Sequence, residues 1–312
     1  MRFWNISLTV SLLFFLPFLF MGDKRILGKE MIISLEHLKQ HVHNIHYDRS
    51  PYDSYPRLEQ AAEYIKGEFL KAGMEVKEDP FQWEGRVYKN IVAEKKGVIS
   101  PCKILIVGAH YDTVPGSPGA DDNASAIAVL LEIARNLQTV PLGRTLRLVA
   151  FSLEEYDYVG STHYAEKVRE GEEKIFGMIS LEMVGFTGPK QNYPHYLNPK
   201  YYPNLGDFIG VIGNERSTSI LERVRSSFKI HIPQLPTEFL IVPGNGEGME
   251  EVRLSDHSPF WDQGLPALMI TDTAFLRNPH YHLPSDTMET LDFEFMRKVA
   301  IGIFHSIVEL GR

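Results

Sequence analysis

The sequence predicts an α/β fold of three layers, in which a mostly parallel or mixed central sheet is sandwiched between helices. Three short segments, 103–109, 145–151 and 175–181, are continuously apolar and rich in branched residues, which is typical of strands covered on both faces. A segment with apolar residues at helical spacing, 124–138, separates the first two. Strand, helix and strand in this order indicate a parallel crossover unit.

The other elements follow from hydrophobic spacing along the chain. An amphipathic helix is predicted at 58–69, and a strand pair is expected at about 75–83 and 88–95. Further strands are predicted near 208–212 and 267–270, and further helices near 217–228 and 293–310. The 312 residues are 44% hydrophobic and 23% charged, without a long linker, so we expect one domain over 23–312.

The first 22 residues have an export-signal pattern. Arg2 precedes an apolar run at 12–21, and charged residues follow at 23–25. Phe20 and Met21 stand where small residues normally precede a cleavage site, so a cleaved signal peptide and a retained N-terminal membrane anchor both stay open. Either interpretation predicts an extracytoplasmic protein that is secreted, periplasmic or anchored to the membrane.

Charge and cysteine content narrow the classes of partner. The net charge of −8 and the pI near 5.9 provide no general attraction to phosphate backbones, so no nucleic acid partner is expected. The single cysteine, Cys102, excludes an intramolecular disulfide and a cysteine-rich metal site. Because Cys102 precedes an apolar strand, we expect it to be a small buried hydrophobic residue. The oligomeric state is not predicted.

Imidazoles and carboxylates follow four of the predicted strands. Ligands of open α/β sheets bind outside the carboxyl ends of the strands, so we expect these side chains to converge. They are His110 and Asp112 after the first strand, Glu154 and Glu155 after the second, Glu182 after the third, and His280, His282 and Asp286 after the strand at 267–270. The loop at 116–125 adds Asp121 and Asp122, which in isolation would be interpreted as a helix cap.

This set of side chains predicts a metal-dependent hydrolase. Imidazole and carboxylate ligands without thiolate favour zinc, with Co²⁺ or Mn²⁺ as chemically allowed substitutes. Two ions about 3.5–4 Å apart can activate a water and polarise a scissile carbonyl. Such a site needs one carboxylate free of metal as general base, and Glu154 with Glu155 offers a base and a ligand side by side.

Five spaced segments carry a resemblance to a known family. They are GAHYDTVPGSPGADDNASA, FSLEEYDYVGS, ISLEMVGF, SDHSPFWDQGLP and YHLPSDT. Their order resembles that of the bacterial leucyl aminopeptidase family of zinc-dependent exopeptidases, over roughly 103–292. The resemblance implies two zinc ions per chain and removal of N-terminal residues from a peptide or small amide substrate. The wider superfamily also contains glutamate carboxypeptidases and single-zinc glutaminyl cyclases.

The resemblance also implies a role for each site residue. It places His110 and Glu182 at one ion, Glu155 and His282 at the other, and Asp122, not Asp121, as the bridge between them. Glu154 takes the position of the general base. Asp112 resembles the carboxylate that fixes the tautomer of the ligating imidazole, and Tyr281 resembles a tyrosine that hydrogen-bonds the carbonyl oxygen in the transition state.

Three alternatives to an aminopeptidase stay open. Glu182 departs from the family pattern, which commonly has aspartate there, and this leaves room for a carboxypeptidase or amidohydrolase. A glutaminyl cyclase would keep the fold and need one zinc ion. A non-catalytic receptor or scaffold is disfavoured, because every expected chemical role has a residue.

Other histidines and acidic residues are set aside from the metal site. His280 is excluded because only His282 fits the Y-H-x-P-x-D-T pattern. The resemblance implies that Asp256 and His257 lie beside the substrate cleft, where they would either line it or support the metal ligands, although their pattern also fits the cap of a short helix. The histidines at 37, 41, 43 and 46 lack the H-E-x-x-H pattern and are interpreted as a solvated helix face.

Overall fold

The computed structural model describes residues 33–312, and these residues form one sheet of eight strands in the order β1-β2-β4-β3-β5-β8-β6-β7. The strands are β1 (Glu75–Trp83), β2 (Arg86–Lys95), β3 (Ser100–His110), β4 (Arg144–Phe151), β5 (Lys174–Glu182), β6 (Ile209–Asn214), β7 (Thr237–Val242) and β8 (Ala267–Thr271). The centre of the sheet, β4-β3-β5-β8, is parallel, and so is the pair β6-β7. The hairpin β1-β2, its junction with β4 and the pair β6-β8 are antiparallel, so the prediction of a mixed sheet is confirmed.

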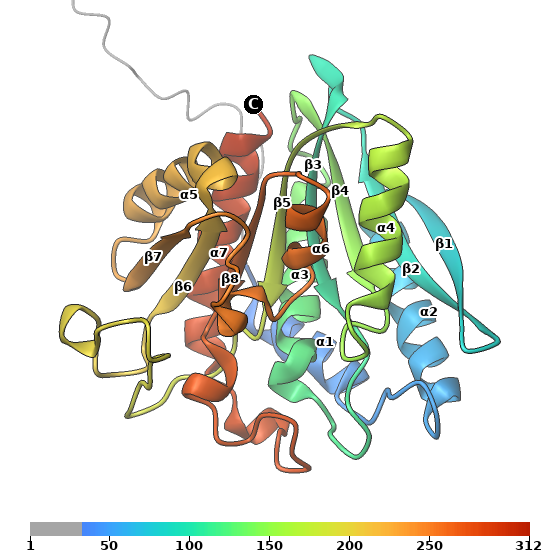
Figure 1. The fold of residues 1–312 in the computed structure, drawn as a ribbon. Coiled ribbons are helices and arrows are strands. Elements are labelled where there is room, and N and C mark those ends of the chain that lie inside the picture. Colours follow the sequence, from blue (N-terminus) through green and yellow to red (C-terminus); the bar gives the residue numbers. More distant parts are fainter. Residues whose placement is uncertain (1–32) are drawn as a thin grey trace, which may run out of the picture.

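Helices cover both faces of the sheet (Figure 1). One face carries α1 (Leu35–Ile45), α2 (Tyr55–Lys71), α3 (Ala126–Leu137), α5 (Thr218–His231) and α7 (Phe293–Leu310). The other carries α4 (Val159–Glu170) and α6 (His257–Asp262), which lie in front of the sheet in Figure 1. Each face has its own cluster of buried apolar side chains, which confirms the three-layer architecture.

The crossover helix α3 is more deeply buried than its predicted apolar stripe implies. Every residue from Ala126 to Ala134 is buried, including Glu132. The sheet contacts α3 on one side, while α1, α2 and α7 pack on its other sides. Because α3 is enclosed, its N-terminal end and the turn before it are held in place by the core.

Two elements and two burial assignments differ from the predictions. The helix α4 and the edge strand β7 were not predicted. Cys102 is exposed and not buried, because the first residues of β3 extend beyond the covering helices. The solvated face predicted for α1 is wrong for His41, which is buried and whose Nδ1 lies 2.7 Å from the hydroxyl of Tyr64 on α2. His37 and His43 are exposed, as expected.

Within residues 33–312, no helix has both the length and the apolar character needed to cross a bilayer. The predicted export segment at 1–22 lies outside the described residues.

Candidate functional site

The carboxyl ends of the parallel strands bring the predicted side chains together around His110, the last residue of β3. The Nε2 atom of His110 lies 3.3 Å from Oδ1 of Asp122, in the irregular turn Ala120–Ser125 that leads into α3. It lies 3.5 Å from Oε1 of Glu182, the last residue of β5, and 3.8 Å from Oε2 of Glu154, just after β4. Three segments far apart in the sequence therefore meet at one imidazole.

A second imidazole lies on the other side of Asp122. The Nε2 atom of His282, in the segment after β8, is 3.2 Å from Oδ2 of Asp122 and 2.9 Å from Oε2 of Glu155. The two oxygens of Asp122 thus face two different histidines. A carboxylate that bridges two metal ions needs this arrangement.

The donor set fits divalent metal ions. The site contains two groups of donor atoms, and within each group all atoms lie within 4.8 Å of one another. One group comes from His110, Glu154 and Glu182, and the other from His110, Asp122 and Glu155. Within the described residues, both ring nitrogens of His110, Nε2 of His282 and Oε1 of Glu155 are buried without a hydrogen-bond partner. Buried polar atoms normally have partners, and imidazole nitrogen with carboxylate oxygen is the ligand chemistry that zinc takes.

The electrostatics of the cluster agree with this fit. Burial alone would lower the pKa of His110, but neighbouring carboxylates, Glu154 first, raise the pKa of His110 well above its ordinary value. Burial opposes the charge of Asp122, yet the two facing histidines lower the pKa of Asp122. Burial, reinforced by Asp122, raises the pKa of Glu155 to about 8. The cluster holds more buried carboxylate than its histidines neutralise, a setting that divalent cations stabilise.

Backbone hydrogen bonds to two further carboxylates hold the site segments in place. Asp112 accepts from the backbone N–H groups of Glu154 and Glu155 at 3.1 and 3.2 Å, and its Oδ1 lies 3.5 Å from Nδ1 of His110. Asp286 accepts from the N–H groups of Asp121 and Asp122 at 3.0 and 3.1 Å. Each carboxylate thus fixes the backbone that carries two neighbouring acidic residues.

Several other supporting groups were not assigned a role from the sequence. The hydroxyl of Ser255 donates to Oε2 of Glu182 at 2.7 Å, and the amide of Asn123 donates to the carbonyl of Leu181 at 2.9 Å. Asp272 accepts from the backbone N–H of Phe186. Asp272 directly follows β8, so the rule that functional groups follow strand ends could have identified it.

Three residues in the loops of the site have unusual backbone conformations. Leu153, Met183 and His282 have φ angles of 61°, 46° and 61°, in the left-handed region that non-glycine residues rarely adopt. Each of them is a proposed ligand or stands beside Glu154 or Glu182. These turns direct the carboxylates and the imidazole toward one point.

The residues set aside from the metal site lie elsewhere. The carboxylate of Asp121 accepts from the side-chain amide of Asn278 at 2.8 Å and from the N–H of Gly185 at 3.0 Å. Nδ1 of His280 lies 3.0 Å from the hydroxyl of Ser285. His257 is buried, and its Nε2 lies 2.8 Å from the carbonyl oxygen of Val252, so it is a core histidine.

Asp256 is buried behind the cluster, and both of its carboxylate oxygens lack a hydrogen-bond partner within the described residues. Burial raises the pKa of Asp256 to about 7. Asp256 does not line the pocket described next, so of its two expected roles the one as a cleft residue is not supported. Its role as a residue that supports the metal ligands stays a prediction.

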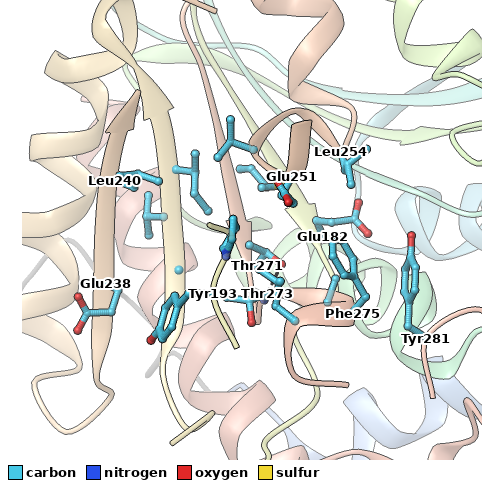
Figure 2. A pocket seen from close by; sticks show the side chains of 18 of the residues that line it. Glu182, Tyr193, Glu238, Leu240, Glu251, Leu254, Thr271, Thr273, Phe275 and Tyr281 are labelled. Carbon is cyan, nitrogen blue, oxygen red and sulfur yellow. Dashed lines mark hydrogen bonds between the residues drawn. The ribbon is translucent and has the colours of Figure 1, made fainter. Parts of the chain in front are cut away.

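A pocket with a cavity volume of about 280 Å³ opens beside the cluster. Figure 2 shows Glu182 and Tyr281 at one end of this pocket and Glu238 and Leu240, on β7, at the other. The ring of Tyr281 stacks on that of His282, with centroids 3.7 Å apart and planes at 20°. The site therefore combines a group of metal-type donors with a long side pocket lined by apolar and acidic side chains, an arrangement that fits a metal-dependent hydrolase.

Comparison with known proteins identifies the family. Peptidase family M28 matches residues 90–307. The uncharacterized protein YfbL of Escherichia coli K12 is 36% identical over 264 residues, which cover 80% of this chain and 80% of that protein. Aminopeptidase YwaD of Bacillus subtilis is 31% identical over 227 residues, 71% of this chain and 44% of the relative, so the chain spans less than half of that aminopeptidase. The chain belongs to peptidase family M28 and is a metal-dependent peptidase.

Solved structures share the fold. BSAP, a zinc aminopeptidase from Bacillus subtilis, superimposes with a TM-score of 0.69 at 16% identity, over 89% of this chain and 95% of that one. A glutaminyl cyclase from Porphyromonas gingivalis superimposes with a TM-score of 0.63 at 20% identity, over 88% of this chain and 97% of that one. At these identities the likeness establishes only that the fold is shared. The same fold occurs in an aminopeptidase and in a glutaminyl cyclase.

Proposed function

We propose that this peptidase is an aminopeptidase that uses two zinc ions to remove N-terminal residues from peptides. One observation carries the proposal: among the described residues, the cleft is lined by acidic side chains and by no lysine or arginine. Besides the proposed metal ligands and Glu154, the acidic residues are Asp157, Glu238 and Glu251. An N-terminal ammonium group is attracted to such a cleft, whereas the terminal carboxylate bound by a carboxypeptidase would find no cationic side chain.

The two histidines divide the proposed ligands into two sets. His110 and Glu182 would hold one ion, and Glu155 and His282 the other. Asp122 would contribute one oxygen to each, in keeping with its distances of 3.3 and 3.2 Å from the two imidazoles. When bound, the ions would polarise the scissile carbonyl and lower the pKa of a bound water.

Glu154 is the proposed general base. Of the three carboxylates near Nε2 of His110, it is the most distant, at 3.8 Å, and it does not pair with His282. Its place in the wall of the cleft allows it to accept a proton from the attacking water and to deliver that proton to the leaving amine.

Tyr281 is the proposed hydrogen-bond donor to the carbonyl oxygen. It lines the cleft beside the proposed ligands, and burial raises the pKa of Tyr281, so its hydroxyl keeps its proton. A donor that is fixed before the reaction stabilises negative charge as it develops on the oxygen.

A comparison of free and blocked peptides tests the aminopeptidase proposal. The zinc-loaded enzyme is expected to hydrolyse a peptide with a free N-terminus and to lose this activity when the N-terminus is acetylated. Equal cleavage of both forms would refute the proposal. Metal analysis separates the glutaminyl cyclase alternative, since we expect about two ions per chain and a cyclase would bind one.

We also propose that residues 1–22 export the enzyme, on the strength of their apolar pattern. Full-length protein expressed in a bacterial host is expected in the periplasm, the medium or the membrane fraction. Deletion of 1–22 should return it to the cytosol. A cytosolic location of the full-length chain would contradict export.

A further inference from the structure

The long pocket is built on one row of residues that crosses four neighbouring strands. Glu182 on β5 pairs with Thr271 on β8, Thr271 pairs with Gly210 on β6, and Gly210 pairs with Glu238 on β7. All four line the pocket. Figure 2 shows Thr271 between Glu182 and Glu238. The row therefore connects the proposed metal centre with a carboxylate at the edge of the sheet.

The alternation of side chains along each strand determines the floor and one wall of this long pocket, which we call the channel. Side chains two residues apart on a strand point to the same face, so the next row on this face contains Met269, Ile212 and Leu240, which also line the pocket. They form an apolar wall. Gly210 adds no side chain to the floor, and a Cβ at this position would already be in ordinary van der Waals contact with Thr271 and Ile212. A long aliphatic chain can lie along this groove.

Two carboxylates of the pocket have no cationic partner in the protein. Within residues 33–312, neither Glu238 nor Glu251 forms an ion pair with lysine, arginine or histidine. Nearby Arg253 is engaged with Asp262 at 2.7 Å instead. The hydroxyl of Tyr196 donates to Oε2 of Glu251 at 2.9 Å and fixes its orientation. An unpaired carboxylate beside an apolar wall loses hydration, so a cationic ligand would be bound favourably.

We propose that this channel selects substrates whose N-terminal residue is arginine or lysine, with Glu251 and Glu238 as the specificity-determining residues. The inference rests on the proposed aminopeptidase function and adds the substrate class. The aliphatic stem of the side chain would lie over Thr271 and Gly210 against the apolar wall. Glu251 and Glu238 lie apart in Figure 2, so the cationic end would bind one of these carboxylates, and the other would add to the negative potential of the pocket.

The dimensions of the row favour a long side chain. Three steps between neighbouring strands span about 14 Å. An extended lysine or arginine side chain reaches about 6–7 Å from its Cα, so it can extend over several residues of this row. A leucine side chain is much shorter and cannot extend as far along the pocket.

The test compares N-terminal arginine and leucine substrates that share one fluorogenic leaving group. The zinc-loaded enzyme is expected to show a kcat/KM at least tenfold higher for arginine. In at least one of Glu251→Gln and Glu238→Gln, the arginine-to-leucine ratio of kcat/KM should fall by roughly ten- to a hundredfold, the range expected for loss of one charge-assisted hydrogen bond. Glu250→Gln is the matched control, because Glu250 is adjacent in sequence, exposed, and not part of the pocket.

The outcomes separate this inference from the function on which it rests. Hydrolysis of the leucine substrate without a preference for arginine would overturn the specificity proposal alone. A preference that survives in both glutamine variants would also overturn it. Absence of hydrolysis of either substrate by the zinc-loaded enzyme would refute the aminopeptidase function and the inference together.

Discussion

Replacing Asp112 by asparagine is expected to weaken metal binding although no proposed ligand is changed. The carboxylate of Asp112 is fully buried and accepts one hydrogen bond from the N–H of Glu154 and one from the N–H of Glu155. Asparagine has one carbonyl oxygen, so its amide group would face the second N–H donor. One segment carrying a proposed base and a proposed ligand would then shift.

The size of the effect follows from these contacts. Loss of one hydrogen bond to a charged acceptor costs about 1.5–3 kcal/mol. If the shift moves the donor atom of Glu155, most of this cost falls on metal affinity, which corresponds to a reduction of roughly 10- to 100-fold. His110 would also lose the carboxylate 3.5 Å from its Nδ1 that favours one tautomer.

Competition with a chromophoric zinc chelator measures this affinity directly, for the native protein and for Asp112→Asn. Asp48→Asn is the control, because the carboxylate of Asp48 also accepts two backbone N–H groups, from Ser50 and Gly116 at 2.9 and 2.8 Å, outside the proposed ligand set. The control should retain native zinc affinity. Equal zinc affinity in Asp112→Asn and the native protein would refute the positioning role of Asp112.

Four further predictions concern the site and the stability of the fold. Glu154→Gln should keep both metal ions and lower kcat by roughly a hundredfold to ten-thousandfold, and loss of metal in this variant would mean that Glu154 is a ligand. Asp122→Asn should deplete zinc at both positions in elemental analysis, and unchanged metal content would refute its bridging role. Tyr281→Phe should lower kcat by roughly a hundredfold with little change in KM, whereas an unchanged kcat would exclude Tyr281 as the donor to the carbonyl oxygen. Burial lowers the pKa of His41 from 6.5 to about 4, so between these pH values the unfolded chain binds a proton that the folded protein excludes. The free energy of unfolding should therefore decrease by about 3 kcal/mol as the pH falls from 6.5 to 4. Urea unfolding at pH 7 and pH 4.5 should show a smaller decrease for His41→Gln than for the native protein.

The parallel centre of the fold could be predicted because its strands are apolar on both faces. The strands at 103–109, 145–151 and 175–181 need no long-range information to be recognised, and their carboxyl ends indicate where polar side chains converge. For this reason His110, Glu154, Glu155 and Glu182 were found from the sequence.

Other elements lack such local signals. The strand β7 lies at the edge of the sheet, is mostly half-buried and does not alternate. Its apolar run, 239–242, has only four residues, and so short a run does not by itself distinguish a strand from a helix. The helix α4 starts after Tyr158, which is in a left-handed conformation and provides no side-chain cap, so the usual start signal is missing.

The supporting contacts depend on the three-dimensional arrangement. Asp286 is 164 residues from Asp122, and Ser255 is 73 residues from Glu182. A sequence shows that these groups can form hydrogen bonds but does not show which segment they meet. The long channel has the same origin, because it depends on the pairing of β5, β8, β6 and β7.

The left-handed backbone at Leu153, Met183 and His282 implies that thermal stability and catalytic turnover place opposite demands on these positions. A residue with a side chain pays on the order of 1 kcal/mol in this conformation, and glycine would relieve it. Selection for heat tolerance alone would thus be expected to introduce glycine at Leu153 or Met183. The added freedom would loosen the neighbouring glutamates, so heat-tolerant variants of this kind should turn over substrate more slowly.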